Sequence, residues 1–281
     1  MSNSPGRFFP LDEQGFILND TDARYVSPAI REAIVSLFQQ QYPQPNALRA
    51  VYLRGSIARG TFVAGISDLD AFAVVDDAQP LRAIQADEQQ AATIRSLLSG
   101  VTELEFTVCR TGDVTGNPLG VWPFFIKTQS LLLAGENFAD RLAPYRPGVT
   151  IMGEAMWLPE RLREYERRLT APEWVDRPQV LCEWLMKAIV RAAFELTMER
   201  HKRYTRDLSL CLQAVSEHFP AQGVWCRQAV EWVLHPPTDL RALQPLLSHF
   251  CPWIEAELRQ QLRHHQIDPA RYQLASSGED A

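Results

Sequence analysis

Asp68 and Asp70, two aspartates separated by a single residue, are the side chains of this sequence best suited to metal chemistry. They stand at the start of an apolar run, Ala71 to Val75, whose composition predicts a β-strand. Residues two apart on a strand point to the same face, so both carboxylates project together while Leu69 turns toward the core. Neighbouring carboxylates repel each other, and a cation between them removes that repulsion. The alternative is a pair of solvated turn residues, because aspartate is common in turns.

A Gly-Ser pair precedes the aspartates, with eleven residues between Ser56 and Asp68. Gly55 and Ser56 follow a second apolar run, Val51 to Leu53, so they open the loop between two predicted strands. A glycine lets the backbone approach a ligand closely, and the serine hydroxyl and amide can receive phosphate oxygens at the start of a turn. Together with Ser67, just before the aspartates, this spacing favours a site for a metal ion and a nucleotide.

The combination of Gly55-Ser56 with Asp68-Leu69-Asp70 resembles the signature of the DNA polymerase β-like nucleotidyltransferases, over roughly Leu48 to Thr111. In size and in its helical second half, the chain is most similar to the aminoglycoside nucleotidyltransferases and their uncharacterised bacterial relatives. The resemblance implies an enzyme that uses Mg²⁺ to move a nucleoside monophosphate, with ATP as the expected donor of AMP, onto a hydroxyl group of a small molecule. An aminoglycoside is one candidate acceptor, and the sequence leaves the acceptor open.

The segment Glu103 to Val108 alternates polar and apolar residues as a half-buried strand does, and the resemblance implies a third carboxylate on this strand. Its two glutamates share one face. On the resemblance, Glu105 matches the third metal-side carboxylate, which would complete a second metal site or act as general base toward the acceptor hydroxyl. Glu103 is the alternative match, and a solvent-facing pair of glutamates without a catalytic role is the other interpretation.

Further nucleotide contacts follow from the same resemblance. Gly55 and Ser56 would contact the β- and γ-phosphates, and Arg59 lies one turn further along. A basic residue of the helical half would also reach the triphosphate. Arg206 is the residue matched to it, with Lys187 and Arg191 as weaker candidates. For each of these cations, a place on the solvated surface is an equally good interpretation.

The strands and helices expected from the sequence pattern indicate an α+β fold. Residues 1–147 are expected to form a nucleotidyltransferase domain, a mixed sheet with flanking helices. Residues 148–274 are expected to form an all-helical bundle domain, and residues 275–281 a disordered tail. In the first domain, apolar spacing predicts helices over 28–41, with Ser27 as N-cap, and over 81–98. The apolar stretch 119–133 predicts a helix from about Pro123, or a strand.

The second half of the chain shows helical periodicity throughout. Its predicted helices cover residues 153–170, 178–201, 208–219, 224–234, 240–250 and 254–263. The segment Asp176-Arg177-Pro178 is expected to cap the second of these helices.

The composition and charge of the chain limit the classes of partner that we expect it to bind. The formal net charge of −6 argues against a general nucleic-acid binder, which usually carries a basic face. No apolar stretch approaches the length of a membrane span, and the N-terminal residues lack the pattern of a secretion signal. Five scattered cysteines show no zinc-binding spacing and are typical of small core residues in a reducing compartment. We therefore expect a cytoplasmic protein without membrane contact.

Two other functions fit the same motif. One is transfer of AMP to a partner protein, as in antitoxin-type members of the superfamily, although these are usually much smaller than 281 residues. The other is a non-catalytic nucleotide-binding protein. The complete set of three carboxylates argues against that function, since a binding protein has no need of a general base at Glu105.

Overall fold

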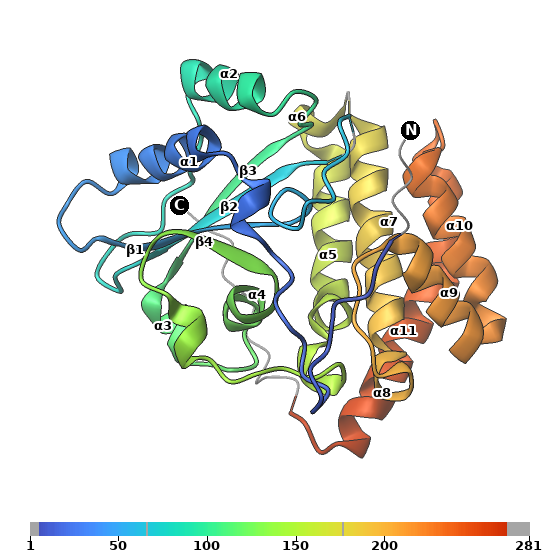
Figure 1. The fold of residues 1–281 in the computed structure, drawn as a ribbon. Helices are drawn as coiled ribbons and strands as arrows, with labels where there is room; N and C mark the ends of the chain where they lie inside the picture. The colour runs from blue at the N-terminus through green and yellow to red at the C-terminus, as the bar shows by residue number, and fades with distance from the viewer. Residues whose placement is uncertain (1–5, 66, 176, 269–281) are drawn as a thin grey trace. The chain divides into compact units, whose positions relative to one another are not determined.

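The computed structural model describes residues 6–65, 67–175 and 177–268, which fall into two compact units (Figure 1). One unit spans Leu18 to Tyr145. The other combines residues 6–17 with the described chain from Arg146 to residue 268. The division falls between Tyr145 and Arg146, close to the predicted domain boundary at residues 147 and 148. The N-terminal arm groups with the helical unit, so the domain limits 1–147 and 148–274 remain a proposal, and the predicted tail 275–281 lies outside the described residues.

The first unit is built on a four-stranded sheet in the order β3-β2-β1-β4. Its strands are β1 (Leu48–Arg54), β2 (Leu69–Val75), β3 (Leu104–Arg110) and β4 (Ser130–Gly135). β1 is antiparallel to both β2 and β4, whereas β2 and β3 are parallel. This is the predicted mixed sheet, and with the helices of the second unit it confirms the α+β class.

Helices cover both faces of this sheet. α1 (Pro28–Gln41) and α2 (Glu88–Leu97) share a core with one face, and α3 (Thr111–Thr115) and α4 (Val121–Gln129) pack on the other. The alternating side chains of the strands feed the two cores, as a two-residue period requires. The sheet is therefore buried on both faces.

Three local predictions in this unit can be compared with the structure. α1 is confirmed, with the hydroxyl of Ser27 accepting a hydrogen bond from the backbone N–H of Ile30. The helix predicted over 81–98 is too long. It begins only at Glu88, because Asp87 and Gln90 form a reciprocal capping box there.

The apolar stretch 119–133 contains both a helix and the beginning of a strand. α4 ends at Gln129 and the chain continues directly as the strand β4. The predicted helix from about Pro123 is present as α4, which begins at Val121, but the end of the stretch is a strand. The leucine-rich sequence of β4 carries no strong strand propensity. Its conformation is set by pairing along the edge of β1.

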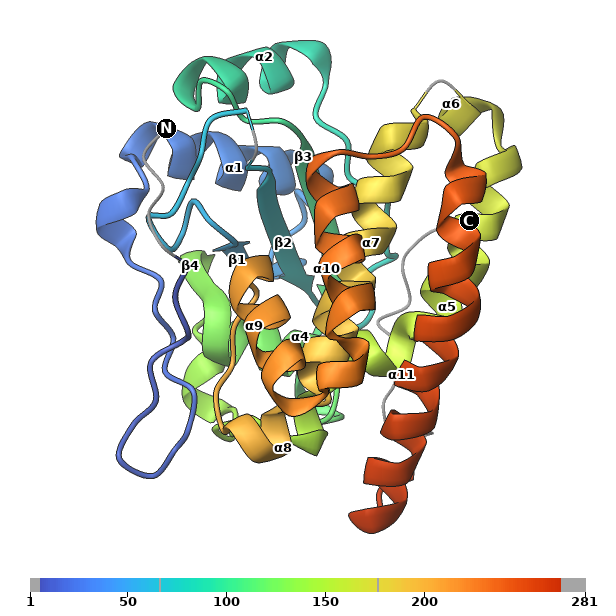
Figure 2. The same ribbon diagram turned by 90° about the vertical axis from the view of Figure 1, so that its right-hand side faces the viewer.

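Within residues 146–175 and 177–268, the second unit contains helices and no strand. Its helices are α5 (Gly153–Thr170), α6 (Pro172–Val175), α7 (Pro178–Glu195), α8 (Met198–His201), α9 (Leu208–His218), α10 (Gly223–Leu234) and α11 (Gln244–His264). α7 packs against α5, α9 and α10, and α11 packs along α5 (Figure 2). Short 3-10 helices occur in the two units at Ala23–Tyr25, Phe138–Arg141, Val149–Ile151, Pro220–Gln222 and Leu240–Leu243.

Two helix predictions of this unit are corrected. The helix predicted to reach His201 ends at Glu195, and α8 follows as a separate turn in which the hydroxyl of Thr197 donates to the carbonyl of Phe194. The helices predicted over 240–250 and 254–263 are one continuous helix, α11, which includes Pro252. Its buried side chains on both sides of the proline hold the two halves in one line. The predicted cap at 176 lies outside the described residues.

All five cysteines are free and buried, as expected of core residues. None of the helices within the described ranges has the length and apolar character needed to span a bilayer.

Candidate active site

Three carboxylates meet at one end of the sheet of the first unit. Asp68 and Asp70 come from the start of β2, and Glu105 from β3. One carboxylate oxygen of each lies within 4.8 Å of the others. The strand register creates the cluster, because Asp70 stands opposite Glu105 in the parallel ladder. The structure thus brings together the three residues that the sequence proposes as metal ligands.

The same register distinguishes Glu105 from Glu103. Glu103 precedes β3, and its backbone carbonyl accepts a hydrogen bond from the N–H of Leu69 at 2.9 Å. Leu69 itself is fully buried, which leaves its neighbours Asp68 and Asp70 directed away from that core. Within the described residues, the carboxylate cluster contains Glu105 and not Glu103.

One member of the site was not anticipated from the sequence. Arg54, the last residue of β1, stands opposite Asp70, and its guanidinium lies 3.1 Å from that carboxylate. The same guanidinium is 4.7 Å from the ring centroid of Phe125. It therefore supplies one positive charge beside the three carboxyl groups. The sequence did offer one signal for Arg54. This residue stands immediately before Gly55 at the end of β1, and that end of the strand lies beside the start of β2, which carries the aspartates.

The electrostatics of the cluster are unbalanced. Partial burial of the carboxyl group, followed by repulsion from Asp70, raises the pKa of Glu105 to about 7, although Arg54 opposes the shift. The residue keeps an exposed surface, so a ligand can reach it. A carboxyl group with this pKa can hold or release a proton near neutral pH.

This pKa predicts that the stability of the metal-free protein falls as the pH rises from about 4.5 to about 7. In that window the folded protein retains a proton on Glu105 that the unfolded chain has lost, so deprotonation favours unfolding. The midpoint of thermal unfolding should therefore fall less steeply with pH in Glu105→Gln than in the wild type, when both are measured in EDTA. Added Mg²⁺ should raise the wild-type midpoint more at pH 8 than at pH 5.5. Equal pH slopes in the two proteins would contradict the assignment.

The Gly55-Ser56 turn lies directly beside the carboxylates. Gly55 has a φ of +83°, and a Cβ atom at this position would lie 3.0 Å from a carboxylate oxygen of Asp70. A glycine is therefore favoured here both by the backbone conformation and by the close approach. The hydroxyl of Ser56 is buried and has no hydrogen-bond partner within the described part of the chain. Such an atom is normally satisfied by a ligand or by water.

Arg59 has a different environment from the one expected of a phosphate contact. Its guanidinium forms two hydrogen bonds of 2.8 Å with the carboxylate of Asp20, and both side chains are largely buried. This ion pair fixes the turn that follows Ser56 to the segment before the first 3-10 helix.

One solved structure similar to this chain is the crystal structure of the spectinomycin adenyltransferase AAD(9) from Enterococcus faecialis with ATP and spectinomycin. The TM-score is 0.51, and the match covers 82% of this chain and 98% of that one. The chain shares the fold of this adenyltransferase. The sequences are 15% identical, a level at which the similarity establishes the fold alone. No protein-family model and no curated protein sequence matches the chain.

The candidate cations of the second unit take part in ion pairs within that unit. Lys187 pairs with Glu183 one turn earlier on α7. Arg206 lies 3.2 Å from Glu154 of α5. Burial by itself would raise the pKa of Glu154, but the positive charges of Arg206 and Arg191 outweigh it, and the pKa lies below its ordinary value.

Arg191 and Glu195 complete this buried ionic group. Burial lowers the pKa of Arg191 to about 10, and burial followed by repulsion from Glu154 raises that of Glu195 well above its ordinary range. Glu195 also accepts a hydrogen bond from the backbone N–H of Ala155 at 2.9 Å. The group therefore joins α5, α7 and the segment before α9.

We expect Arg206→Ala to lower the free energy of unfolding by about 3 kcal/mol, because it leaves the carboxylate of Glu154 with one neutralising charge fewer in a buried setting. Urea denaturation measures this loss. The double variant Glu154→Gln/Arg206→Ala should recover part of it, since no uncompensated charge remains at position 154. A single variant as stable as the wild type would show that the ion pair does not support the fold.

Proposed function

We propose that the protein is a nucleotidyltransferase that requires Mg²⁺ and transfers a nucleoside monophosphate from a nucleoside triphosphate to a hydroxyl group of a small molecule. The observation that carries the proposal is the meeting of Asp68, Asp70 and Glu105 beside the Gly55-Ser56 turn. Carboxylates suit a hard cation, and a glycine-serine turn with a buried, unsatisfied hydroxyl suits phosphate oxygens.

The three carboxylates fit Mg²⁺ in number and spacing. Oxygens bound to one Mg²⁺ at about 2.0–2.1 Å are about 3 to 4 Å apart, and small side-chain rotations would close the cluster to that spacing. In our proposal Asp68 and Asp70 hold the ion and Glu105 lies at its acceptor side. A bound Mg²⁺ would neutralise charge that develops on the phosphates.

The proposed chemical step places each group of the chain in a defined role. The acceptor oxygen forms a bond to the α-phosphorus, the bond from that phosphorus to the β-phosphate oxygen breaks, and pyrophosphate leaves. The proton of the acceptor hydroxyl passes to the carboxylate of Glu105, which stands beside Asp70 in the parallel ladder. The backbone at Gly55 and the hydroxyl of Ser56 orient the departing phosphates.

The cations proposed to bind phosphate would each have to exchange a partner. Arg59, Lys187 and Arg206 are paired with Asp20, Glu183 and Glu154 respectively. Lys187 is the most readily released, because its pair is a solvent-accessible contact within one helix and contributes little stability. We retain all three as candidate nucleotide contacts.

ATP is the proposed donor, and spectinomycin is the first acceptor to test, because the similar adenyltransferase was solved with both. Use of ATP and the five buried free thiols fit a reducing compartment, so we propose a cytoplasmic location.

The decisive assay measures pyrophosphate release with Mg²⁺ and each of the four triphosphates, against spectinomycin and a panel of aminoglycosides. We expect release with ATP and at least one acceptor, and mass spectrometry should find the acceptor heavier by one AMP. Calorimetric titration of ATP with and without Mg²⁺ separates the two ways of failing. Mg²⁺-dependent binding without release would mean that the acceptor lies outside the panel. The absence of both binding and release would refute the proposed function.

A further inference from the structure

We propose that His201, Glu217 and His218 form a second metal site, selective for a divalent transition-metal ion of the Zn²⁺ class. All three residues belong to the helical unit. His201 is the last residue of α8, and Glu217 and His218 are the last two residues of α9. The proposed transferase chemistry makes no use of them.

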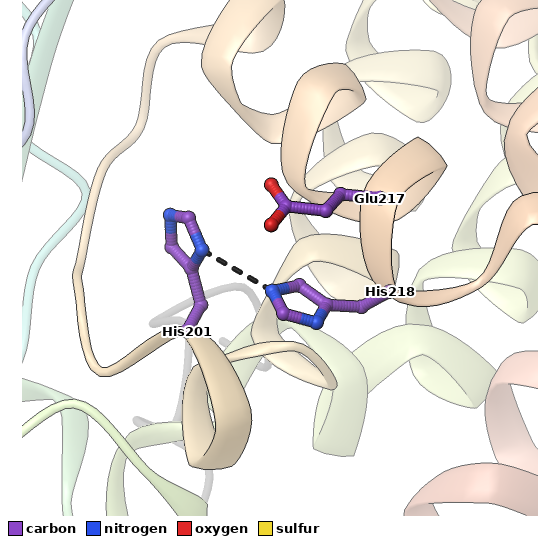
Figure 3. Close-up of side chains that lie close together, drawn as sticks. All are labelled: His201, Glu217 and His218. Carbon is purple, nitrogen blue, oxygen red and sulfur yellow. Dashed lines mark hydrogen bonds between the residues drawn. The ribbon is translucent and has the colours of Figure 1, made fainter.

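The geometry of the three side chains is that of a chelating group. Nδ1 of His201 lies 3.3 Å from Nε2 of His218, and a carboxylate oxygen of Glu217 lies within 4.8 Å of the histidine ligand atoms. Figure 3 shows the carboxylate and the two facing nitrogens directed toward one common space. Two nitrogens bound to a tetrahedral Zn²⁺ at about 2.0–2.1 Å would be about 3.3 Å apart. The imidazoles are therefore already at the spacing that a shared ion needs.

The ligand types determine the class of ion. Imidazole nitrogen suits Zn²⁺, Cu²⁺ and Ni²⁺, whereas Mg²⁺ prefers an all-oxygen environment such as the carboxylate cluster of the first unit. Two histidines and one glutamate supply three of the four positions of a tetrahedral site, and leave the fourth for water or another ligand.

The surroundings keep the site ready for a cation. His201 and His218 are half-buried and Glu217 is exposed, so solvent reaches one side of the cluster. The ring of Phe8 packs against His201 with 5.2 Å between centroids, which fixes one side of the ligand. Both Glu217 and His218 lie in the last turn of α9, where the helix dipole favours positive charge.

A bound ion would fasten the end of α8 to the far end of α9. The chain between them contains residues 202–207, the segment in which Arg206 reaches Glu154. The ion would therefore cross-link a loop of the helical unit in the way that a disulfide does, and a cross-link that binds only the folded state stabilises it.

The test uses the full chain without an affinity tag, freed of metal with EDTA. One equivalent of Co²⁺ should give the intense visible absorption of four-coordinate cobalt, and one equivalent of Zn²⁺ should remove it. We expect His201→Gln, His218→Gln and Glu217→Gln each to weaken Zn²⁺ binding by about tenfold or more, since even changes to groups that only support a ligand cost about 10–100-fold. Zn²⁺ should raise the thermal midpoint of the wild type more than that of these variants.

Two control variants separate this site from other metal binding. His264→Gln removes an exposed histidine of α11 outside the cluster, and Asp70→Asn disables the carboxylate cluster, so both should bind Co²⁺ and Zn²⁺ as the wild type does. The exposed Glu217 can be changed without disturbing the core, and circular dichroism of each metal-free variant establishes that it is folded. The proposal is overturned if the folded wild type shows only the weak absorption of six-coordinate cobalt, or if the folded Glu217→Gln and His218→Gln variants bind Zn²⁺ as tightly as the wild type.

Discussion

Asp70→Asn will reduce nucleotidyl transfer by about a thousandfold or more while leaving the protein folded. A thousandfold loss corresponds to about 4 kcal/mol of transition-state stabilisation. The physical reason is charge. An asparagine keeps the shape of the side chain and can still accept a hydrogen bond from Arg54, but it removes one of the negative charges that would hold Mg²⁺. Initial rates of pyrophosphate release measure the effect.

Asp76→Asn is the matched control for this prediction. Asp76 follows the other end of β2, where it accepts a hydrogen bond from the backbone N–H of Ala78 and lies 3.7 Å from Arg49. The Asp76→Asn substitution therefore makes the same chemical change next to the same strand, but away from the carboxylate cluster. We expect activity close to that of the wild type. Folded Asp70→Asn protein with at least a tenth of the wild-type rate would contradict the role of Asp70 as a metal ligand.

Asp70→Asn should change stability only slightly, within about 1 kcal/mol. The substitution weakens the ion pair with Arg54, but it also relieves repulsion between Asp70 and Glu105. The two effects oppose each other, so urea denaturation of the metal-free proteins should give similar midpoints. Loss of activity with retained stability is the signature that separates a site residue from a residue of the core.

Gly55→Ala will lower both stability and activity. At a φ of +83°, an alanine costs about 1–2 kcal/mol of conformational energy. Its Cβ atom would also lie 3.0 Å from a carboxylate oxygen of Asp70, so that side chain or the turn must shift. Displacing a reacting group by about 1 Å can cost about a hundredfold in rate, and we expect a loss of that size.

Gly65→Ala distinguishes the two effects of that substitution. Gly65 has a φ of +79°, and a Cβ atom there would meet nothing within 4 Å. The control therefore carries the same backbone penalty without the contact to Asp70. Thermal unfolding should show similar losses of stability in both variants, whereas the assay of pyrophosphate release should show a large loss of activity only in Gly55→Ala. Equal activities would mean that the close approach at Gly55 does not position the cluster.

The sequence by itself determined the two aspartates of the carboxylate cluster and the class of the fold. Alternation along two short apolar runs places Asp68 and Asp70 on one face and buries Leu69, and this follows from the two-residue period of any strand. The same period selects the polar face of the strand that contains Glu105. Local rules of this kind also predicted α1 and its cap at Ser27, because both depend only on neighbouring residues.

Only the tertiary structure decided which residues meet across strands and helices. The choice between Glu103 and Glu105 depends on the register of β2 against β3, and the place of Arg54 depends on the register of β1 against β2. Neither register is encoded within a single segment. β4 is a strand because β1 offers it an edge, and α11 continues through Pro252 because its buried face is held on both sides of the proline.

The charged residues of the helical unit also show the difference between what the sequence determines and what the packed fold determines. The sequence could mark Arg206 and Lys187 as cations, but it could not pair them. Partners separated by many residues in the chain, such as Arg206 with Glu154, become neighbours only when the helices pack. Residue types are fixed by the sequence, whereas contact between distant residues is a property of the packed fold.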